Sequence, residues 1–400
     1  MNEQNKKVPT VRFKGFTNDW EQHKLEEMAE IVRGASPRPI KDKKWFDSNS
    51  TIGWIRISDV TAQNGRIYHL SQHISKLGQQ KTRVVIQPHL LLSIAASVGY
   101  PVINYIPTGV HDGFLIFNNP KFNINYMFYW LRKYQTNWKK YGQPGSQVNL
   151  NSSIVSNTKV RLPSLDEQAT ISNIFYQIDK ILSLQQRKLD LLKQLKKGLL
   201  QKMFADKDSK RPVLQFKIFH DDWEQRKLGD LIKEFSIKSK IEDEYKVLSS
   251  TNSGMKFREG RVTGTSNLGY KIIKNGDLVL SPQNLWLGNI NINNIGKGLV
   301  SPSYKTFKLI NIDSSFINPQ LRTQKMLEEY KNSSTQGASV VRRNLEIDSF
   351  YQIKIFVPTI SEQEKIGSFF QRLDNTIVLQ HQKLAKCQSV KKSLLQQMFI

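Results

Sequence analysis

Two segments of this sequence occur twice, in the same order. Residues 13–25 return as residues 216–228 with 9 of 13 positions identical at an offset of 203, and residues 163–204 return as residues 358–399 with 17 of 42 identical at an offset of 195. The stretches between them have similar lengths but share little sequence. Because each unit is far longer than a solenoid repeat, the pattern indicates the duplication of a whole domain. The fold must therefore hold two divergent bodies on one repeated scaffold.

The repeats divide the 400 residues into four parts. We predict a first body at 1–161 with its lead-in at 1–25, a long helix within 162–207, a second body with its own lead-in at 208–356, and a second long helix within 357–400. Both bodies contain short β-branched runs separated by Gly, Pro, Asn and Asp. Such runs are typical of strands joined by turns, so we expect an α+β fold with twisted, mainly antiparallel sheets.

Each predicted helix begins with a capping signal and carries a coiled-coil pattern. Ser164 and Glu167 have the hydroxyl-to-carboxylate spacing of a capping box, and the second helix repeats it. Apolar residues then recur at alternating spacings of three and four, which is the heptad seam of a coiled coil. The predicted seam comprises Ile171, Ile174, Ile178, Ile181, Leu192, Leu195 and Leu199, and Ile366, Phe369, Leu373, Val390 and Leu394. A flanking apolar column comprises Phe175, Leu182, Leu189 and Met203, and Phe370, Ile377, Leu384 and Met398.

A lone helix cannot bury such a stripe. Packing of each helix on its own body is one solution, but the sequence favours antiparallel pairing of the two helices, because each leads away from a different body. Residues 167–204 would form a rod of roughly 57 Å at about 1.5 Å per residue. This arrangement predicts a pseudo-twofold molecule with two separated bodies, which suits the recognition of two separated half-sites on a duplex.

The charge of the chain points to a polyanionic partner. There are 59 Lys and Arg residues against 34 Asp and Glu, a formal net charge of +25, which favours nucleic acid or an acidic membrane surface. A basic surface kept for solubility is the alternative. The single cysteine, Cys387, excludes an intrachain disulfide. The most apolar stretch, residues 90–103, is too short to span a bilayer, and the N-terminus has no signal-peptide pattern, so we expect a cytoplasmic protein without a membrane partner.

The sequence contains no complete catalytic motif. It has no glycine-rich cofactor turn and no phosphate-binding loop. Residues 244–246 and 329–331 match the acidic-x-Lys tripeptide of metal-dependent nucleases, but chance accounts for them in a chain this rich in Lys and Glu. His69 and His73 stand four apart without an obvious third metal ligand. We therefore expect no enzyme activity and no catalytic residue, metal or cofactor on this chain.

The ordered, doubled set of motifs resembles the DNA-sequence specificity subunits of type I restriction-modification enzymes. The pattern Pro-x-x-x-Glu-Gln-x-x-Ile begins at Pro163 and again at Pro358, and both helices end in Leu-Leu-Gln-x-Met-Phe. Asp-Trp-Glu occurs in both lead-ins, and residues 54–59 and 298–304 also match the family. The resemblance implies two target-recognition domains alternating with two conserved helices that form an antiparallel coiled coil. Each domain would bind one half of an asymmetric, interrupted site.

The resemblance also implies the partners. Double-stranded DNA is the expected ligand, the helices would set the spacer and dock two methyltransferase (M) subunits, and two restriction/translocase (R) subunits would complete the enzyme. S-adenosylmethionine is expected on the methyltransferase partner, and ATP and Mg on the nuclease partner. The first body has residues 109–114 in place of the block at 298–304, so its loops should differ. A free-standing DNA-binding protein or regulator, and a nuclease with a site near Glu244 or Glu329, are the alternatives.

Basic and amide side chains on loops are the candidates for DNA contact, because Lys and Arg bind phosphates and Arg, Asn, Gln and Ser recognise base edges. The candidates in the first body are Arg33, Ser36, Arg38, Lys41, Lys43, Lys44, Arg56, Gln143, Ser146 and Gln147. Those in the second body are Asn252, Lys256, Arg258, Gln283, Asn284, Trp286, Ser339, Arg342, Arg343 and Asn344. A plain surface role is the alternative for each of them, and Trp286 is equally compatible with a core position. Arg342 and Arg343 are the strongest candidates.

Overall fold

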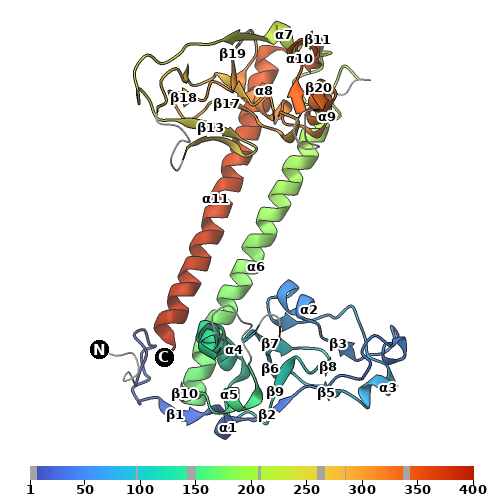
Figure 1. Ribbon diagram of the computed structural model, residues 1–400, viewed down its shortest axis with the longest axis vertical. Helices are drawn as coiled ribbons and strands as arrows, with labels where there is room; N and C mark the ends of the chain where they lie inside the picture. The colour runs from blue at the N-terminus through green and yellow to red at the C-terminus, as the bar shows by residue number, and fades with distance from the viewer. Residues whose placement is uncertain are drawn as a thin grey trace. The chain divides into compact units, whose positions relative to one another are not determined.

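The computed structural model describes residues 7–95, 98–141, 150–205, 209–258, 266–283, 285–336 and 343–400. The chain forms two compact units, which we call unit 1 (residues 1–186 and 383–400) and unit 2 (residues 187–382). Two long helices, α6 (Leu165–Lys202) and α11 (Ile360–Met398), run continuously through the boundaries, so each unit contains part of both helices (Figure 1). The long helices predicted within residues 162–207 and 357–400 are therefore present.

The body of unit 1 is built on a five-stranded sheet with the order β2-β9-β6-β7-β4. Its neighbouring strands are antiparallel except for β4 and β7. A smaller sheet, β3-β8-β5, and the antiparallel pair β1-β10 complete it. The strands are β1 (Glu21–Lys24), β2 (Glu30–Arg33), β3 (Gly53–Trp54), β4 (Arg66–Ile67), β5 (Arg83–Val85), β6 (Leu90–Ser93), β7 (Pro101–Asn104), β8 (Thr108–Val110), β9 (Phe114–Asn118) and β10 (Lys159–Leu162). The helices are α1 (Leu25–Met28), η2 (Lys43–Trp45), α2 (Ile57–Ala62), α3 (Lys76–Gln79), α4 (Ile124–Tyr134), η3 (Gln135–Tyr141) and α5 (Ser152–Ser156).

Both faces of the five-stranded sheet are buried. Leu90 and Leu92 of β6 pack in one core cluster together with α4, whereas Leu91 packs in a second cluster. Successive side chains of a strand point to opposite faces, so an unbroken apolar run is what a sheet buried on both sides requires. Residues 126–131 of α4 are all buried. Strands β6 and β7, which lie within the apolar stretch 90–103, thus supply the centre of the unit 1 core.

The body of unit 2 has a four-stranded sheet with the order β12-β19-β16-β17, and the smaller antiparallel pairs β13-β14, β15-β18, β20-β21 and β11-β22. Its strands are β11 (Glu224–Lys227), β12 (Ile232–Phe235), β13 (Leu248–Thr251), β14 (Gly254–Phe257), β15 (Lys271–Ile273), β16 (Leu278–Leu280), β17 (Ile290–Ile292), β18 (Gly298–Val300), β19 (Lys305–Leu309), β20 (Ser334–Gln336), β21 (Arg343–Leu345) and β22 (Lys354–Val357). Its helices are α7 (Leu228–Leu231), η4 (Leu285–Leu287), α8 (Ser314–Gln320), α9 (Gln324–Asn332) and α10 (Ile347–Tyr351).

The two bodies share a topology although they share little sequence. The order β12-β19-β16-β17 in unit 2 corresponds to β2-β9-β6-β7 in unit 1. The burial pattern corresponds too, because Leu278 and Leu280 of β16 face one core cluster while Val279 faces another. The predicted α+β class and the internal duplication are confirmed, and the duplication includes the bodies.

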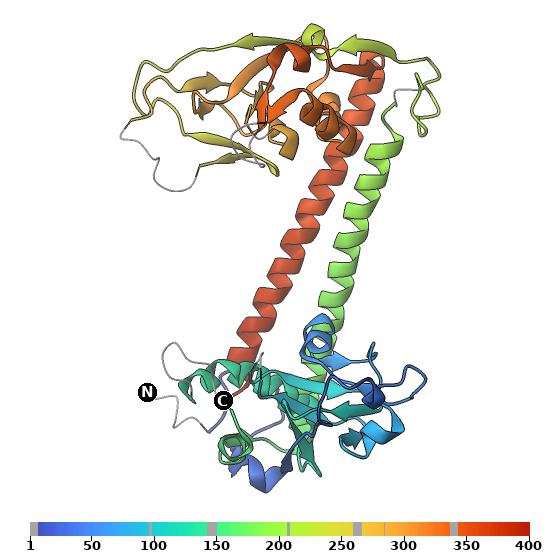
Figure 2. The same ribbon diagram turned by 45° about the vertical axis from the view of Figure 1, so that its right-hand side comes forward.

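Equivalent helix segments pack antiparallel in each unit. In unit 1 the start of α6 packs against the end of α11, with the Phe175 and Phe399 ring centroids 5.5 Å apart. In unit 2 the end of α6 packs against the start of α11, with the Phe204 and Phe370 ring centroids 5.8 Å apart. The helix segments of each unit run side by side in both views (Figures 1 and 2). The predicted antiparallel pairing is confirmed within each unit.

The predicted seam is wrong at four positions. Ile174, Ile181, Leu195 and Val390 are exposed. The flanking column supplies much of the buried surface instead: Phe175, Leu189, Met203, Phe370, Leu384 and Met398 are buried. Of the other seam residues, Ile171, Ile366 and Leu373 are buried, and Ile178, Leu192, Leu199, Phe369 and Leu394 are half-buried. A straight α-helix drifts by about 20° per heptad against a 3.5-residue repeat, and the helix ends also pack on the bodies, which moves the buried face to the flanking column.

The repeated Glu-Gln pair joins each long helix to its body. Gln168 accepts a hydrogen bond from the Asn123 backbone N–H (2.9 Å) and donates to the Pro163 carbonyl (2.9 Å). Gln363 makes the same two bonds, to Asp313 (2.8 Å) and to the Pro358 carbonyl (2.8 Å). Since Asn123 and Asp313 are the N-caps of α4 and α8, one glutamine fixes the starts of two helices in each unit.

Of the predicted capping boxes, the structure shows only the hydrogen bond to the Ser164 hydroxyl at the start of α6. The Glu167 N–H donates to Ser164 Oγ over 3.4 Å, but the Glu167 carboxylate binds Arg12 of the lead-in through Nε (2.7 Å) and Nη2 (2.8 Å). The equivalent Glu362 accepts a hydrogen bond from Gln215 over 3.0 Å. A carboxylate near a helix N-terminus is favoured by the helix dipole whichever donor it takes, and here the donor comes from the lead-in.

The lead-ins dock in equivalent ways on opposite helices. The Val11 N–H donates to the Gln397 carbonyl at the end of α11 (3.0 Å), and the Leu214 N–H donates to the Lys202 carbonyl at the end of α6 (2.8 Å). Trp20 and Trp223 follow in the two lead-ins and are both buried. The repeated lead-in sequences are therefore part of the scaffold that closes each unit.

Candidate nucleic-acid interface

Three predicted DNA-binding residues of unit 1 converge on one residue, Asp112. Arg33 Nε donates to the Asp112 carbonyl (2.6 Å), Ser36 Oγ donates to Oδ1 (2.8 Å), and Arg38 Nη2 donates to Oδ2 (2.5 Å). Burial acts to raise the pKa of Asp112, but the Ser36 hydrogen bond and the Arg38 charge outweigh it and lower that pKa. The anionic side chain thus organises a loop of cationic groups at the end of β2.

The lysines that follow lie on a loop anchored by a tryptophan. Lys41, Lys43 and Lys44 are exposed, whereas Trp45 is buried and donates from Nε1 to the Pro39 carbonyl (3.0 Å). Lys44 Nζ lies 4.6 Å from the centre of the Trp45 ring. The loop therefore presents ammonium groups from a fixed base, which is what phosphate contacts require.

Arg56 has internal partners. Its Nε lies 3.2 Å from Asp59 Oδ2, and its Nη2 donates to Ser71 Oγ over 2.5 Å. The hydrogen bond to Asp59 raises the pKa of Arg56. Its guanidinium braces the start of α2, and its contact with DNA stays a prediction.

In unit 2 the candidates lie on two groups of loops. Asn252, in the turn of the β13-β14 hairpin, and the nearby Lys256 and Arg258 are all exposed. The Asn252 carbonyl accepts a hydrogen bond from Arg322 Nη2, which ties the hairpin turn to the segment between α8 and α9.

The second group joins two segments that are distant in sequence. The Leu345 N–H of β21 donates to the Pro282 carbonyl (3.2 Å), which brings the loop of Gln283 beside the strand of Arg343 and Asn344. Gln283 and Asn344 are exposed, and Arg343 Nη2 donates to the Ser334 carbonyl (3.1 Å). Trp286 is half-buried and packs against the unit 2 core, so the core alternative describes it better than a DNA contact. Gln143, Ser146, Gln147, Asn284, Ser339 and Arg342 lie outside the described residues.

The sequence did not point to the groups that hold these loops. Asp112 lies in the segment that replaces the family block of the second body, and an isolated Asp in a turn gives no pattern to detect. Arg83 donates from Nε to the Arg33 carbonyl (2.8 Å). Away from these loops, the buried Arg66 of β4 donates to Asn125 Oδ1 (2.8 Å) and to the Tyr129 hydroxyl (3.1 Å) of α4. These contacts join residues far apart in sequence, so only the folded chain shows them.

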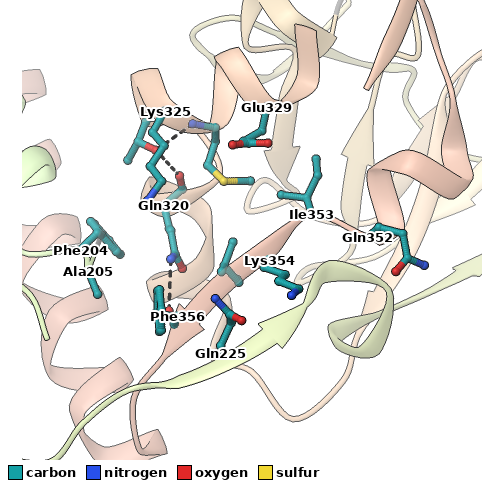
Figure 3. A pocket seen from close by; sticks show the side chains of 13 residues that line it. Phe204, Ala205, Gln225, Gln320, Lys325, Glu329, Gln352, Ile353, Lys354 and Phe356 are labelled. Carbon is teal, nitrogen blue, oxygen red and sulfur yellow. Dashed lines mark hydrogen bonds between the residues drawn. The ribbon is translucent and has the colours of Figure 1, made fainter. Parts of the chain in front are cut away.

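Two depressions in unit 2 adjoin the end of α6. One has a volume of about 360 Å³ and lies between Phe204, Gln320 and Phe356, with Lys325 and Glu329 of α9 at its wall (Figure 3). Gln320 is buried and donates from Nε2 to the Phe356 carbonyl (3.3 Å). The other has a volume of about 720 Å³ and is strongly basic. The two depressions have Phe204, Ala205, Thr323 and Lys325 in common.

The histidine and glutamate candidates of the sequence do not come together as a metal site in the part of the chain that the structure describes. Within those residues, no group of three or more His, Cys, Asp or Glu side chains is placed to hold a metal. His69 and His73 do not lie on a helix, and Glu244 accepts a hydrogen bond from Ser239 (2.7 Å). Among the same residues, no helix combines the length and the apolarity needed to cross a membrane.

Comparison with known proteins identifies the scaffold. The model of the type I restriction modification DNA specificity domain matches this chain twice, over residues 17–194 and 220–388. The chain belongs to this family. Each match contains a body and most of the long helix that follows it, so the family's repeated unit is the duplicated segment of the sequence.

Individual specificity subunits are similar over two thirds or more of the chain. The MjaX specificity subunit of Methanocaldococcus jannaschii is 24% identical over 412 residues, covering 94% of this chain and 92% of that protein. The MjaVIII specificity subunit of the same organism is 22% identical and covers 68% of both chains. The crystal structure of the type I restriction-modification S subunit from M. genitalium has a TM-score of 0.61 at 14% identity, covering 98% of this chain and 99% of that one. The specificity-subunit fold therefore extends over both units.

Proposed function

We propose that this chain selects the DNA site for a type I restriction-modification enzyme and carries no catalytic centre of its own. Each body binds one half of an asymmetric, bipartite site, and the long helices set the spacer between the halves. The observation that carries the proposal is that two bodies of one topology stand on a repeated scaffold while their loops differ. A scaffold kept twice around different loops is suited to recognising two different half-sites.

The loop chemistry supports DNA as the ligand. Unit 1 presents Arg38, Lys41 and Lys43 around the Asp112 and Trp45 anchors, and unit 2 presents Lys256 and Arg258 on the hairpin. Arg38, which is held by Asp112, can bind a phosphate with little loss of conformational entropy, and the exposed lysines and Arg258 can provide further phosphate contacts. Exposed amides such as Asn252, Gln283 and Asn344 are the groups that pair with adenine edges.

Exposed apolar residues on the long helices support docking of methyltransferase subunits. Leu165, Leu184 and Val390 in unit 1 are exposed, and so are their equivalents Ile360, Leu379 and Leu195 in unit 2. Because the same set occurs once in each unit, we infer two equivalent docking surfaces and hence two methyltransferase subunits. The repetition of these residues at equivalent helix positions in both units, rather than their exposure alone, supports a shared role. A free-standing regulator would have no use for such a repeated surface, and this disfavours that alternative.

The remaining chemistry is assigned to the partners. We infer that the methyltransferase subunits bring S-adenosylmethionine, and that two restriction/translocase subunits bring ATP and Mg. A structure that describes complex assembly in a type I restriction-modification system covers 95% of this chain with a TM-score of 0.55 at 14% identity. Its likeness to this fold is compatible with such an assembly.

Co-expression with the methyltransferase subunit tests the proposal. Single-molecule methylome sequencing of the host should show one asymmetric, interrupted motif that is methylated only when both proteins are present. The chain should also co-purify with the methyltransferase subunit. Methylation that is independent of this chain, or a continuous motif without a spacer, would contradict the proposal.

A further inference from the structure

The larger depression in unit 2 is a basic groove. Recognition of bases by the loops does not explain why cationic side chains gather there. Its volume is about 720 Å³, and its lining includes five cationic side chains, Lys193, Lys196, Lys197, Arg322 and Lys325, against the two acidic side chains Asp374 and Glu328. Cationic side chains gathered around a concave surface concentrate positive potential there, since the low-dielectric walls focus the field.

One of the two acidic side chains of the groove, Asp374, is already paired with a lysine. Lys196 Nζ lies 2.5 Å from Asp374 Oδ1, which neutralises that carboxylate. Glu328 accepts a hydrogen bond from Gln324 over 3.3 Å. The excess positive charge therefore comes chiefly from Lys193 and Lys197, which lie on one face of α6, and from Arg322.

Arg322 connects the groove to the recognition loops. It is half-buried at the groove wall and donates to the carbonyl of Asn252 in the β13-β14 turn. Burial lowers the pKa of Arg322, and the charge of Asp374 offsets this only in part. An anion next to a partly buried guanidinium stabilises its charged form. The N-terminus of α9, at Gln324 and Lys325, adds the positive end of a helix dipole to the same wall.

We propose that this groove binds the phosphate backbone of the duplex next to the half-site that unit 2 recognises. The inference rests on the proposed function and adds to it a phosphate-binding surface on α6 and α9, outside the recognition loops. The connection of Arg322 to the hairpin turn favours DNA over an acidic surface of a protein partner, because the hairpin carries the predicted DNA contacts Lys256 and Arg258. Such a site supplies affinity without base preference.

The salt dependence of DNA binding tests the groove. The complex of the full chain with its methyltransferase partner is titrated with a labelled duplex containing the methylated motif, and with an unrelated duplex, at several KCl concentrations. The variant Lys193→Gln/Lys197→Gln should weaken binding to both duplexes. It should also reduce the slope of log K against log[salt] by about 0.9 for each phosphate that the groove no longer neutralises. Its methylome motif should be unchanged.

The matched control removes the same charge elsewhere in unit 2. Lys217→Gln/Lys227→Gln alters two exposed lysines of the lead-in that do not line the groove, and should leave the slope at the wild-type value. A groove variant that folds, as judged by circular dichroism, and keeps the wild-type slope overturns the inference. If instead the folded variant no longer co-purifies with the methyltransferase, the groove is a protein-docking site and the inference is equally wrong. If the wild-type complex itself binds neither duplex, the proposed function is wrong, and this result differs from a failure of the groove alone.

Discussion

Glu167 and Glu362 occupy equivalent positions of the two repeats but have different partners. Glu167 forms a two-point ion pair with Arg12, and both side chains are largely buried. Glu362 has the neutral Gln215 in place of the arginine, and burial raises the pKa of Glu362. The same scaffold position is therefore a charged anchor in unit 1 and a carboxyl with no cationic partner of this kind in unit 2.

Substituting each glutamate by glutamine should have opposite effects. Glu167→Gln leaves Arg12 without its anionic partner and should destabilise the chain by about 1.5–3 kcal/mol. Glu362→Gln keeps a neutral acceptor for Gln215 and should raise the melting temperature at pH 7. The folded pKa of Glu362 lies above its unfolded value of about 4.3, so its contribution to stability falls as pH rises through that range and the advantage of Gln grows. Calorimetry from pH 4 to 8 measures both, and a Glu362→Gln protein less stable than wild type at pH 7 contradicts the account.

Arg343 offers a test of base recognition within the described residues. Arg343→Ala should relax one position of the second half-site, with a loss of discrimination of about 1–3 kcal/mol if the side chain recognises guanine. The first half-site should stay unchanged, and the control Lys227→Ala should leave both half-sites unchanged. Methylome sequencing of the variant reports both halves at once, and an unaltered motif together with unaltered DNA affinity removes Arg343 from the interface.

At the scale of elements, each body is completed by the end of the helix that starts on the other. Phe399, which follows the end of α11, packs on Phe175 and Tyr126 in unit 1. Phe204, which follows the end of α6, packs on Phe370 and Phe316 in unit 2. Two ion pairs at equivalent positions also join the helices, because Lys391 binds Asp179 in unit 1 and the equivalent Lys196 binds Asp374 in unit 2. The antiparallel register of the helices is thus fixed by equivalent contacts in the two units.

Double-mutant cycles should rank the two ion pairs. The Lys391 and Asp179 side chains are 18% and 16% exposed, and the Tyr129 hydroxyl also donates to Asp179 (2.8 Å). The Lys196 and Asp374 side chains are 28% and 48% exposed, so solvent screens them more. We expect a coupling energy of about 1–2 kcal/mol for the first pair and below about 1 kcal/mol for the second. Urea unfolding of the alanine variants measures both, and equal or reversed couplings contradict this ranking.

The sequence predicted the long helices well, but it did not predict which helix faces are buried or which side chains contact one another. Periodicity and capping signals located the long helices, because these are local properties of the chain. The same periodicity placed Ile174 and Leu195 in the seam although they are exposed, since the bodies also compete for the helix surface. Asp112 and Arg322, which hold the candidate loops in place, act through contacts between distant segments, and no local pattern marks them.

At the scale of the whole molecule, the long helices connect two recognition bodies. Helices α6 and α11 are both continuous through the unit boundaries near Gln186 and Gln382. Inserting one turn into both helices, near Gln185 and Gln380, adds about 5.4 Å of helix to each. The spacer of the methylated motif should lengthen by one or two base pairs, at about 3.4 Å per pair, while both half-sites stay the same. The same spacer in the methylome of the insertion variant would refute the role of the helices in spacing.

If the two bodies bind DNA in the same way and differ only in the bases they recognise, doubling the first body should make the site symmetric. The experiment uses a chain in which residues 220–388 are replaced by a second copy of residues 17–194, co-expressed with the methyltransferase subunit. Because equivalent helix segments pack antiparallel, methylome sequencing should show the first half-site twice, in inverted orientation, around a spacer close to that of the wild type. A motif that still contains the second half-site, or that stays asymmetric, would contradict the account.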